Sequence, residues 1–550
     1  MSKKFVIALA VCIGLSGCSS SSPTHKALDL ASYQSQQVVW DDCPSGYLLP
    51  KDQQAKVFDH KSVQCGFVTV PAEYTDGYTL PDFKIAMMRE PATGSTKLGT
   101  LFINPGGPGE SGVEELQWLD FPATIRAHYD IIGFDPRGVS RSAPVTGHQI
   151  KCSTQSDFET YWTDENSPAN DEEYLATMDT LDAYYHKCAT DNPTWWTLNT
   201  NNVVDDLELM RQVVTGSEPL NFLGSSYGTS IAADYITKYP EHIGHIALDS
   251  PTTDEPTNDS VAIEDAKTLE QNVMRLVKGY AKKKHMTVSE VKNLMLQARQ
   301  DADDDKLLGF AGMKILDAEN QVHLSTEYML THGIQALTYY DLATAQPYFN
   351  DGLDRVTGPD KWNGLFEYFA LELDGYNTDT LGGPTYDPAK IERNNSYEIM
   401  DIVDSMDINY SIKTSRAHDE ALQKQIEEVS PFWTAMTSDA TKYEYQGERT
   451  SIDWDTLATD DAQIPDPPTS MPARTNTSGK PVLVVGSRYE STTPYVFAQK
   501  TAEDLKSPLV TFNGTGHAPL AGFDKKCLNK IFIDYFINDK LPTKSVTCKK

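Results

Sequence analysis

Short apolar runs alternate with stretches of helical spacing along much of this chain. The runs expected to be strands are residues 65–71, 83–88, 99–104, 129–134, 220–223, 243–248, 481–485 and 509–512. The first two alternate apolar and polar side chains, which is typical of paired strands, joined here by a turn region at Asp76-Gly77. Helical spacing is found at residues 202–214, 229–239 and 528–537. Strands that alternate with helices favour a mostly parallel sheet covered on both faces.

The longest interval between predicted strands, residues 250–479, is too long to be a loop. Its pattern is mainly helical, at residues 263–280, 288–299, 325–343, 362–373 and 417–428. Residues 463–478 are rich in Pro, Thr and Ser and read as the linker that returns to the sheet. We therefore expect a helical cap inserted after the sixth strand. No internal repeat or coiled-coil heptad is visible in the sequence.

The first residues have the pattern of an export signal. Lys3 and Lys4 precede an apolar run at residues 5–15, and small residues follow it, which indicates a secretory signal rather than a membrane span. Leu15-Ser16-Gly17-Cys18 resembles a bacterial lipobox, which implies cleavage before Cys18 and a lipid on its thiol. An ordinary signal peptide with a chance cysteine is the alternative. Because Ser19 rather than Asp follows, the resemblance implies an outer-membrane lipoprotein that faces the periplasm or the exterior.

Charge and cysteine content narrow the partners and the compartment. The formal net charge is −31, which disfavours nucleic acid and anionic membrane surfaces, so membrane contact is expected only through the lipid anchor. Six cysteines remain after Cys12 leaves with the signal and Cys18 takes the lipid, and an even set in an exported chain suggests disulfides. Fifteen pairings are possible, of which sequence neighbours favour Cys43–Cys65, Cys152–Cys188 and Cys527–Cys548. No CxxC spacing suggests a metal site.

The segment Gly224-Ser225-Ser226-Tyr227-Gly228 carries the strongest chemical signal. An apolar strand leads into it and a helical segment follows, so Ser226 is expected at a sharp strand-to-helix turn. Flanking glycines permit such a tight turn, and the helix start places free N–H groups beside the hydroxyl. The pattern predicts a nucleophile elbow, with Ser226 as the nucleophile.

An elbow within eight strands, the first of them antiparallel, fits an α/β-hydrolase core. The expected fold is an eight-stranded, mostly parallel sheet with a large helical cap after the sixth strand. The corresponding division is a signal peptide at residues 1–17, a tether at 18–38, the N-terminal part of the core at 39–251, the cap and return linker at 252–478, and the C-terminal part of the core at 479–550.

A serine nucleophile needs a base and an acid, which in this fold follow it in the order Ser, acid, His. His517 lies on a glycine-flanked loop after the last predicted strand, where an exposed base belongs. Glu490 is the acidic residue in the loop after the seventh strand, and a glutamate can hold an imidazole as an aspartate does. Asp249, directly after the sixth strand, is the reserve candidate for the acid.

Backbone N–H groups are needed to stabilise the oxyanion that forms when Ser226 attacks. Tyr227, which follows the nucleophile, is expected to supply one of them. The Gly/Pro-rich loop after the third strand, residues 105–109, is expected to supply the other. Gly106 and Gly107 are the candidates, with Gly107 slightly preferred.

With these residues in hand, the chain resembles the tripeptidyl aminopeptidase branch of the α/β-hydrolase serine peptidases, to which proline iminopeptidases are related. The resemblance rests on motifs at residues 104–112, 135–142, 224–229, 493–495 and 516–517, and on the terminal Cys527 and Cys548. It implies release of short peptides or single residues from free N-termini through an acyl-enzyme, without metal or cofactor. The family usually has aspartate where this chain has Glu490, which leaves the acid assignment open.

The resemblance also implies a peptide substrate whose ammonium group is held by anions in the cap. Glu372 and Asp374 are the candidates, and a monomer is expected. Two other functions stay open. The same chemistry would serve an esterase or amidase acting on non-peptide substrates, and the Asp-to-Glu departure would also suit a peptide-binding lipoprotein without activity.

Overall fold

The computed structural model describes residues 28–549, apart from residues 52, 60, 76–79, 153–182, 184–185, 254–257, 305, 308–314, 317–320, 323–325, 360, 374–394, 408–415 and 438–472. The predicted signal peptide, Cys18, the turn at Asp76-Gly77, most of the return linker and Asp374 lie outside the described residues. The side chain of Glu372 is also outside them, although its backbone forms part of a helix.

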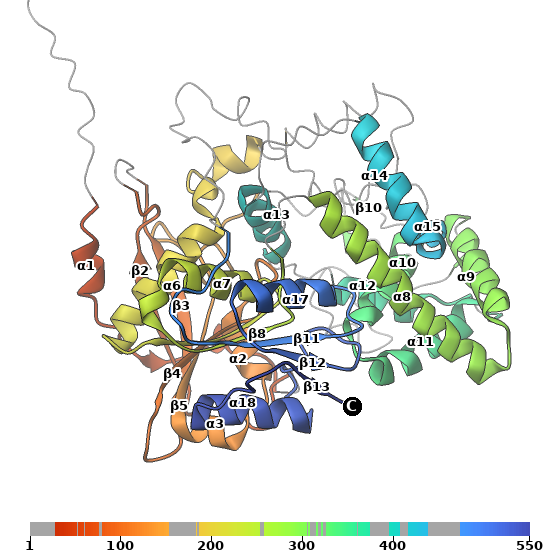
Figure 1. The fold of residues 1–550 in the computed structure, drawn as a ribbon. Helices are drawn as coiled ribbons and strands as arrows, with labels where there is room; N and C mark the ends of the chain where they lie inside the picture. Colours follow the sequence, from red (N-terminus) through yellow and green to blue (C-terminus); the bar gives the residue numbers. More distant parts are fainter. Residues whose placement is uncertain are drawn as a thin grey trace, which may run out of the picture.

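One twisted sheet organises the core, and its strands follow the order β1-β2-β3-β5-β4-β7-β8-β11-β12-β13 (Figure 1). The strands that correspond to the eight predicted ones are β2 (Gln64–Val70), β3 (Phe83–Glu90), β4 (Gly99–Asn104), β5 (Tyr129–Phe134), β7 (Leu220–Ser225), β8 (Ile243–Asp249), β11 (Leu483–Ser487) and β12 (Leu509–Phe512). Neighbours from β5 through β12 pair in parallel, whereas β2, β3 and β5 pair antiparallel. The predicted α/β-hydrolase sheet is therefore confirmed.

Three short strands of the main sheet were not predicted from the sequence. The strands β1 (Asp41–Asp42) and β6 (Ala143–Pro144) pair with β2 and β3, and β13 (Val546–Cys548) pairs in parallel with β12. Strands of two or three residues produce too little alternation to be recognised from sequence.

Helices cover both faces of the sheet because successive side chains of its strands point to opposite sides. On β4, Phe102 packs into one core with α6 (Thr200–Thr215) and α7 (Gly228–Lys238). Its neighbours Leu101 and Ile103 pack into a second core. That second core contains side chains of α2 (Gly112–Trp118), α3 (Ala123–His128) and α18 (Lys526–Asn538). Figure 1 shows α3 and α18 on the side of the sheet opposite α6, α7 and α17 (Tyr495–Asp504).

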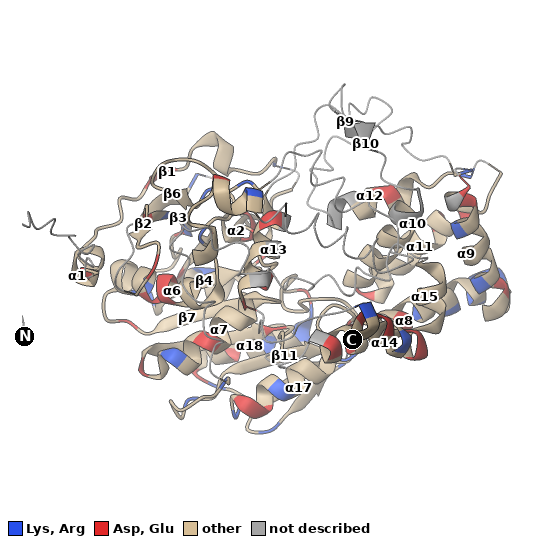
Figure 2. Cartoon of the chain, turned by 90° about the horizontal axis from the view of Figure 1, so that it is seen from above, with Lys and Arg blue, Asp and Glu red and all other residues tan. Residues whose placement is uncertain are grey.

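A helical region lies between β8 and β11 in the sequence, as expected. Its described helices are α8 (Asn258–Lys284), α9 (Val288–Asp303), α10 (Thr326–Ala336), α11 (Leu342–Val356), α12 (Gly364–Leu373), α13 (Ser396–Asp407), α14 (Arg416–Val429) and α15 (Pro431–Met436). Several of them share a core of their own, centred on Val277, Leu337, Phe349 and Trp433. The helices α8 to α12 lie beside the sheet (Figures 1 and 2), whereas Ser396, the first residue of α13, packs against Gly109 in the loop after β4. We call residues 258–436 the cap.

The prediction of one cap helix over residues 325–343 is wrong, because two helices occupy this region. The helix α10 ends at Ala336, a 3-10 turn follows at Leu337–Tyr339, and α11 starts after Asp341. The Asp341 carboxylate accepts a hydrogen bond of 2.8 Å from the Ala343 amide and so caps the new helix. The break matters for the site, because it places Tyr339 against the loop that carries His517.

The three disulfides join Cys43 to Cys65, Cys152 to Cys188, and Cys527 to Cys548, as sequence proximity suggested. The last one ties the start of α18 to β13, the strand at the end of the sheet. Within the described part of the chain, we find no helix with the length and apolar character needed to cross a bilayer.

Candidate active site

Ser226 occupies the sharp bend between β7 and α7, with a positive φ of 52°. The bend is tight because the flanking glycines approach other backbone atoms closely. A Cβ atom on Gly224 would lie 2.2 Å from the Gly228 carbonyl oxygen, and one on Gly228 would lie 2.4 Å from the Asn104 carbonyl oxygen. Only glycine fits at these two positions, which explains the sequence motif around Ser226.

The Gly/Pro-rich loop after β4 lies directly against this bend. A Cβ atom on Gly106 would be 2.7 Å from the Ser225 carbonyl oxygen, 2.8 Å from the Tyr227 nitrogen and 3.0 Å from Ser226 Cβ. Gly106 and Gly107 both have positive φ, at 110° and 97°. The Gly106 N–H donates to Asn104 Oδ1 at 3.1 Å, so this amide already has a partner and Gly107 is the better candidate donor to a ligand.

His517 and Glu490 meet, although 27 residues separate them in the sequence. His517 Nδ1 forms a short hydrogen bond with Glu490 Oε1. Glu490 is almost fully buried, and it also accepts hydrogen bonds from Thr493 Oγ1 at 2.6 Å and from Ser250 Oγ at 2.8 Å. The carboxylate is thus held by hydroxyl donors on two different loops. This arrangement fixes the histidine ring and directs its other nitrogen away from the acid.

The end of β8 connects the elbow to the acid and histidine loops. The carbonyl of Asp249 accepts from the Ser226 amide at 3.0 Å, and its carboxylate accepts from the Leu520 amide at 2.8 Å. Ser250 donates to Glu490 through its hydroxyl, whose oxygen also accepts from the Ala518 amide at 3.0 Å. Asp249 and Ser250 therefore hold the segments of Ser226, Glu490 and His517 at one edge of the sheet. Among residues 249 and 490, it is Glu490 that binds the imidazole.

The electrostatics of the site follow from burial and from these contacts. Burial lowers the pKa of His517, but the charge and hydrogen bond of Glu490 outweigh it, so the pKa is raised above 6.5. Asp249 is completely buried, and burial raises the pKa of its carboxyl to about 8. Asp249 is therefore mainly protonated at neutral pH. A neutral residue here leaves Glu490 as the acid that can stabilise a protonated His517.

Sequence reasoning missed Ser250, Thr493 and Tyr339 as parts of this site. The Tyr339 carbonyl accepts from the His517 amide at 2.8 Å, and its ring packs edge-on against the imidazole with centroids 5.8 Å apart. This contact joins the cap to the loop that carries His517, and no sequence signal indicates it, because it depends on the break between α10 and α11. Ser250 directly follows the reserve acid, and Thr493 lies in the motif at residues 493–495, so these two positions offered a hint.

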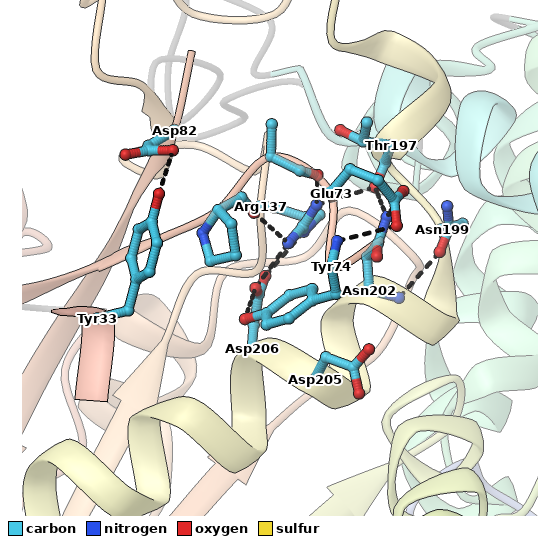
Figure 3. A network of polar contacts seen from close by, with 12 residues as sticks. Tyr33, Glu73, Tyr74, Asp82, Arg137, Thr197, Asn199, Asn202, Asp205 and Asp206 are labelled. Atoms are coloured by element: carbon cyan, nitrogen blue, oxygen red, sulfur yellow. Dashed lines mark hydrogen bonds and ion pairs between the residues drawn. The ribbon is translucent and has the colours of Figure 1, made fainter. Parts of the chain in front are cut away.

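A buried ion pair supports the loop after β5, which carries the motif at residues 135–142. Arg137 donates to both carboxylate oxygens of Asp206, at 2.8 and 2.6 Å, and Tyr74 donates to Asp206 at 2.8 Å (Figure 3). The guanidinium also donates to the backbone carbonyls of Pro71, Ala72 and Thr197. Arg137 thereby joins the β2 end, the β5 end and α6. Asp206 lies in the second turn of its helix, because the helix starts at Thr200, two residues before the predicted start at residue 202.

Comparison with known proteins agrees with this fold. Residues 99–294 match the family model described as alpha/beta hydrolase fold, and residues 453–548 match the one described as TAP-like protein. Serine protease Hip1 of Mycobacterium tuberculosis is 26% identical over 531 residues, which cover 93% of this chain and 91% of the relative. Tripeptidyl aminopeptidase of Streptomyces coelicolor is 32% identical over 237 residues, covering 41% of this chain and 39% of the relative. Carboxylesterase B of Mycobacterium tuberculosis is 26% identical over 541 residues, covering 93% and 90%.

The fold and these relatives define the protein as a serine hydrolase built on the α/β-hydrolase fold. More closely, the similarity to serine protease Hip1 and to tripeptidyl aminopeptidase supports an α/β-hydrolase peptidase, and residues 453–548 are similar to TAP-like proteins.

Proposed function

We propose that this protein is a serine aminopeptidase that uses Ser226, His517 and Glu490 as its catalytic residues. The observation that carries the proposal is the hydrogen bond between His517 and Glu490 on loops that share Asp249 and Ser250 with the Ser226 elbow. A base oriented by a buried acid beside an elbow serine is the arrangement that activates a hydroxyl.

In the proposed mechanism, Ser226 Oγ attacks the scissile carbonyl carbon while His517 Nε2 accepts the hydroxyl proton. The oxyanion accepts hydrogen bonds from the N–H groups of Tyr227 and Gly107. His517 then donates its proton to the leaving amine, the C–N bond breaks, and an acyl-enzyme ester remains. Water adds to the ester with His517 again as base, which releases the acid product and restores Ser226. Glu490 stabilises the imidazolium in both halves of the reaction.

The proposed substrates are peptides with a free N-terminus, from which single residues or short peptides are released. The similarity to tripeptidyl aminopeptidase supports this choice. The cap contributes Tyr339 to the surroundings of His517, which supports the proposal that the cap limits the length of the peptides cleaved. Glu372 and Asp374 stay predictions for binding the ammonium group, because neither side chain is among those described.

The experiment that tests the proposal compares peptide p-nitroanilides with free and acetylated N-termini against p-nitrophenyl esters. We expect the free peptides to have the highest kcat/KM, and Ser226→Ala to remove turnover. The similarity to carboxylesterase B makes ester hydrolysis the competing function. Higher kcat/KM for esters or blocked peptides would reject the aminopeptidase assignment. Failure of wild-type Ser226 to react with a fluorophosphonate would instead favour a protein that binds peptides without cleaving them.

We further propose that the mature protein starts at Cys18 and is anchored by lipid in the bacterial cell envelope, at the outer membrane. The lipobox-like sequence supports this, and the three disulfides are typical of exported proteins. Expression with labelled palmitate tests it. We expect label in the wild-type protein, whereas Cys18→Ala should carry none and should leave the membrane fraction.

A further inference from the structure

The oxyanion loop continues into three glutamates that have very different surroundings. Glu114 forms an ion pair of 2.8 Å with Arg141, and Glu115 is buried against the second core. Glu110 is exposed to solvent. In the described part of the chain, no hydrogen bond or ion pair to its carboxylate is present, and Arg141, the nearby cation, binds Asp135 and Glu114 instead. Among the described residues Glu110 therefore has no lysine or arginine partner, and the cation whose charge acts on it is His517.

The position of Glu110 is close to the reacting groups. Its amide donates to the Gly106 carbonyl at 3.2 Å, and its Cγ lies 3.2 Å from where a Cβ on Gly107 would be. Its side chain thus begins against the glycine that is the candidate oxyanion donor. The charge of Glu110 also contributes to the raised pKa of His517.

Glu110 also lies where the cap meets the core. A Cβ atom on the preceding Gly109 would be 2.1 Å from the carbonyl oxygen of Ser396, the first residue of α13. The cap helix therefore packs directly on the oxyanion loop. Glu110, the next residue, therefore lies at this junction of the oxyanion loop and the cap.

We propose that Glu110 is a specificity-determining residue that binds a positively charged group of the substrate near the scissile bond. This inference rests on the proposed function at Ser226. An unpaired carboxylate attracts a cation and disfavours an anion. In a peptide, the cation is either the N-terminal ammonium or a Lys or Arg side chain. Both sources offer the same chemistry to the carboxylate.

Binding to a catalytically inactive protein tests this without depending on turnover. Four tetrapeptide amides, X-Ala-Ala-Ala with X as lysine or norleucine and with a free or acetylated N-terminus, are titrated by calorimetry into the Ser226→Ala protein. With Glu110 intact, we expect a cationic peptide to bind on the order of 10-fold more tightly than its neutral counterpart. Glu110→Gln should remove this preference.

The two pairs of peptides distinguish the two sources of charge. Loss of the preference for free over acetylated N-termini assigns Glu110 to the ammonium group, and loss of the preference for lysine over norleucine assigns it to the side chain. Asp120→Asn is the matched control, because Asp120 is an exposed acid beyond the far end of α2, and it should leave both preferences unchanged. The inference would be overturned if the Glu110→Gln protein preferred cationic over neutral peptides as strongly as the protein with Glu110 intact. It would also be overturned if neither protein preferred cationic peptides.

Folding and catalysis are checked separately. Thermal unfolding of Glu110→Gln shows whether the variant is folded, and Glu110→Ala offers a second variant if it is not. Kinetics of the active protein show whether the same ratio appears in kcat/KM. If the wild-type protein hydrolyses no peptide while the cation preference still depends on Glu110, the proposed function fails and this inference stands. If peptides are cleaved with no dependence on Glu110, only this inference fails.

Discussion

The hydroxyl of Ser250 donates a hydrogen bond of 2.8 Å to Glu490 Oε2, across 240 residues of sequence. Its oxygen accepts from the Ala518 amide, one residue after the candidate catalytic histidine. Ser250 itself is fixed to the neighbouring strand, because its amide donates to the Val485 carbonyl at 2.9 Å. One hydroxyl at the end of β8 therefore sets the relative position of the acid and the histidine loop.

We expect Ser250→Ala to lower kcat about 10-fold with little change in KM, because an acid that loses a donor orients His517 less well. Ser487→Ala is the control. Ser487 is also buried at a strand end, but in the described structure its hydroxyl has no hydrogen-bond partner, so its removal should leave kcat unchanged. Steady-state kinetics of both variants check this. A normal kcat for Ser250→Ala would show that Ser250 has no part in positioning the acid.

Glu490→Gln is expected to lower kcat by on the order of 10³- to 10⁴-fold, since an amide does not stabilise the imidazolium and favours the wrong tautomer. Glu490→Asp should retain more activity but stay below wild type, because its carboxylate is one methylene short of His517 and of Thr493. Single-turnover kinetics with a peptide p-nitroanilide measure both. Full activity of Glu490→Gln would show that a residue other than Glu490 is the acid that supports His517.

The pH profile follows from the raised pKa of His517. Only the neutral imidazole accepts a proton from Ser226, so kcat/KM should increase with pH and reach half its plateau above pH 6.5. Glu490→Gln removes the negative charge that raises this pKa, and the midpoint should then move to lower pH. The residual activity of the variant, measured between pH 5 and 9, checks the direction. An unchanged midpoint would mean that the increase of kcat/KM with pH reflects the titration of a group other than His517.

The parts of this site that sequence could predict are those with local signatures. The elbow and the oxyanion loop carry glycines that their tight turns require, and His517 and Glu490 directly follow strands with clear apolar runs. These signals arise from neighbours in the chain. Their conformational causes are therefore visible in the sequence itself.

The parts that sequence could not predict depend on contacts between distant segments. Nothing in the sequence marks Ser250, because its contact with Glu490 forms only when β8 pairs with β11. The role of Asp206 depends on Arg137, which reaches it from the loop after β5, 69 residues earlier in the sequence. The break after Ala336 likewise matters only because it brings Tyr339 to the loop of His517, where the Tyr339 carbonyl accepts a hydrogen bond from the His517 amide. Composition and periodicity contain no information on such pairs.

Gly106→Ala should reduce kcat by on the order of 10²- to 10³-fold, comparable to the loss of an oxyanion donor. The new Cβ would be 2.7 Å from the Ser225 carbonyl and 2.8 Å from the Tyr227 nitrogen, and the φ of 110° disfavours alanine. Gly46→Ala is the control, because nothing lies within 4 Å of its Cβ position. Kinetics combined with fluorophosphonate labelling rates check the effect. Equal labelling rates in the two variants would argue against an oxyanion role for this loop.

Asp206→Ala is expected to destabilise the fold by about 3–5 kcal/mol, because it leaves the fully buried Arg137 guanidinium without its counter-ion. Asp191→Ala breaks an exposed pair with Lys187 and should cost at most about 1 kcal/mol. Denaturant unfolding of both variants measures the difference. If Asp206→Ala and Asp191→Ala lost similar amounts of stability, the buried ion pair of Arg137 would contribute no more to stability than an exposed one.

Asp249 gives a prediction about stability and pH. Its carboxyl has a pKa of about 8 in the folded protein because it is completely buried, against about 3.9 in an unfolded chain. Between these values the unfolded state binds fewer protons than the folded state, so this group makes the folded state less stable as the pH rises. The loss amounts to about 1.4 kcal/mol per pH unit. Burial raises the pKa of Glu115 too, and Glu115 therefore adds to the same trend in the wild-type protein.

Asp249→Asn keeps an oxygen acceptor for the Leu520 amide but has no proton to lose. The free energy of unfolding of Asp249→Asn, minus that of the wild type, should therefore increase as the pH rises from 5 to 8. Below pH 4 this difference should stay constant. Denaturant unfolding at each pH measures the difference, and Asp120→Asn, an exposed acid, should show no such trend. A constant difference between wild type and Asp249→Asn from pH 5 to 8 would mean that Asp249 is ionised in the folded protein. In that case it would compete with Glu490 for the charge of a protonated His517.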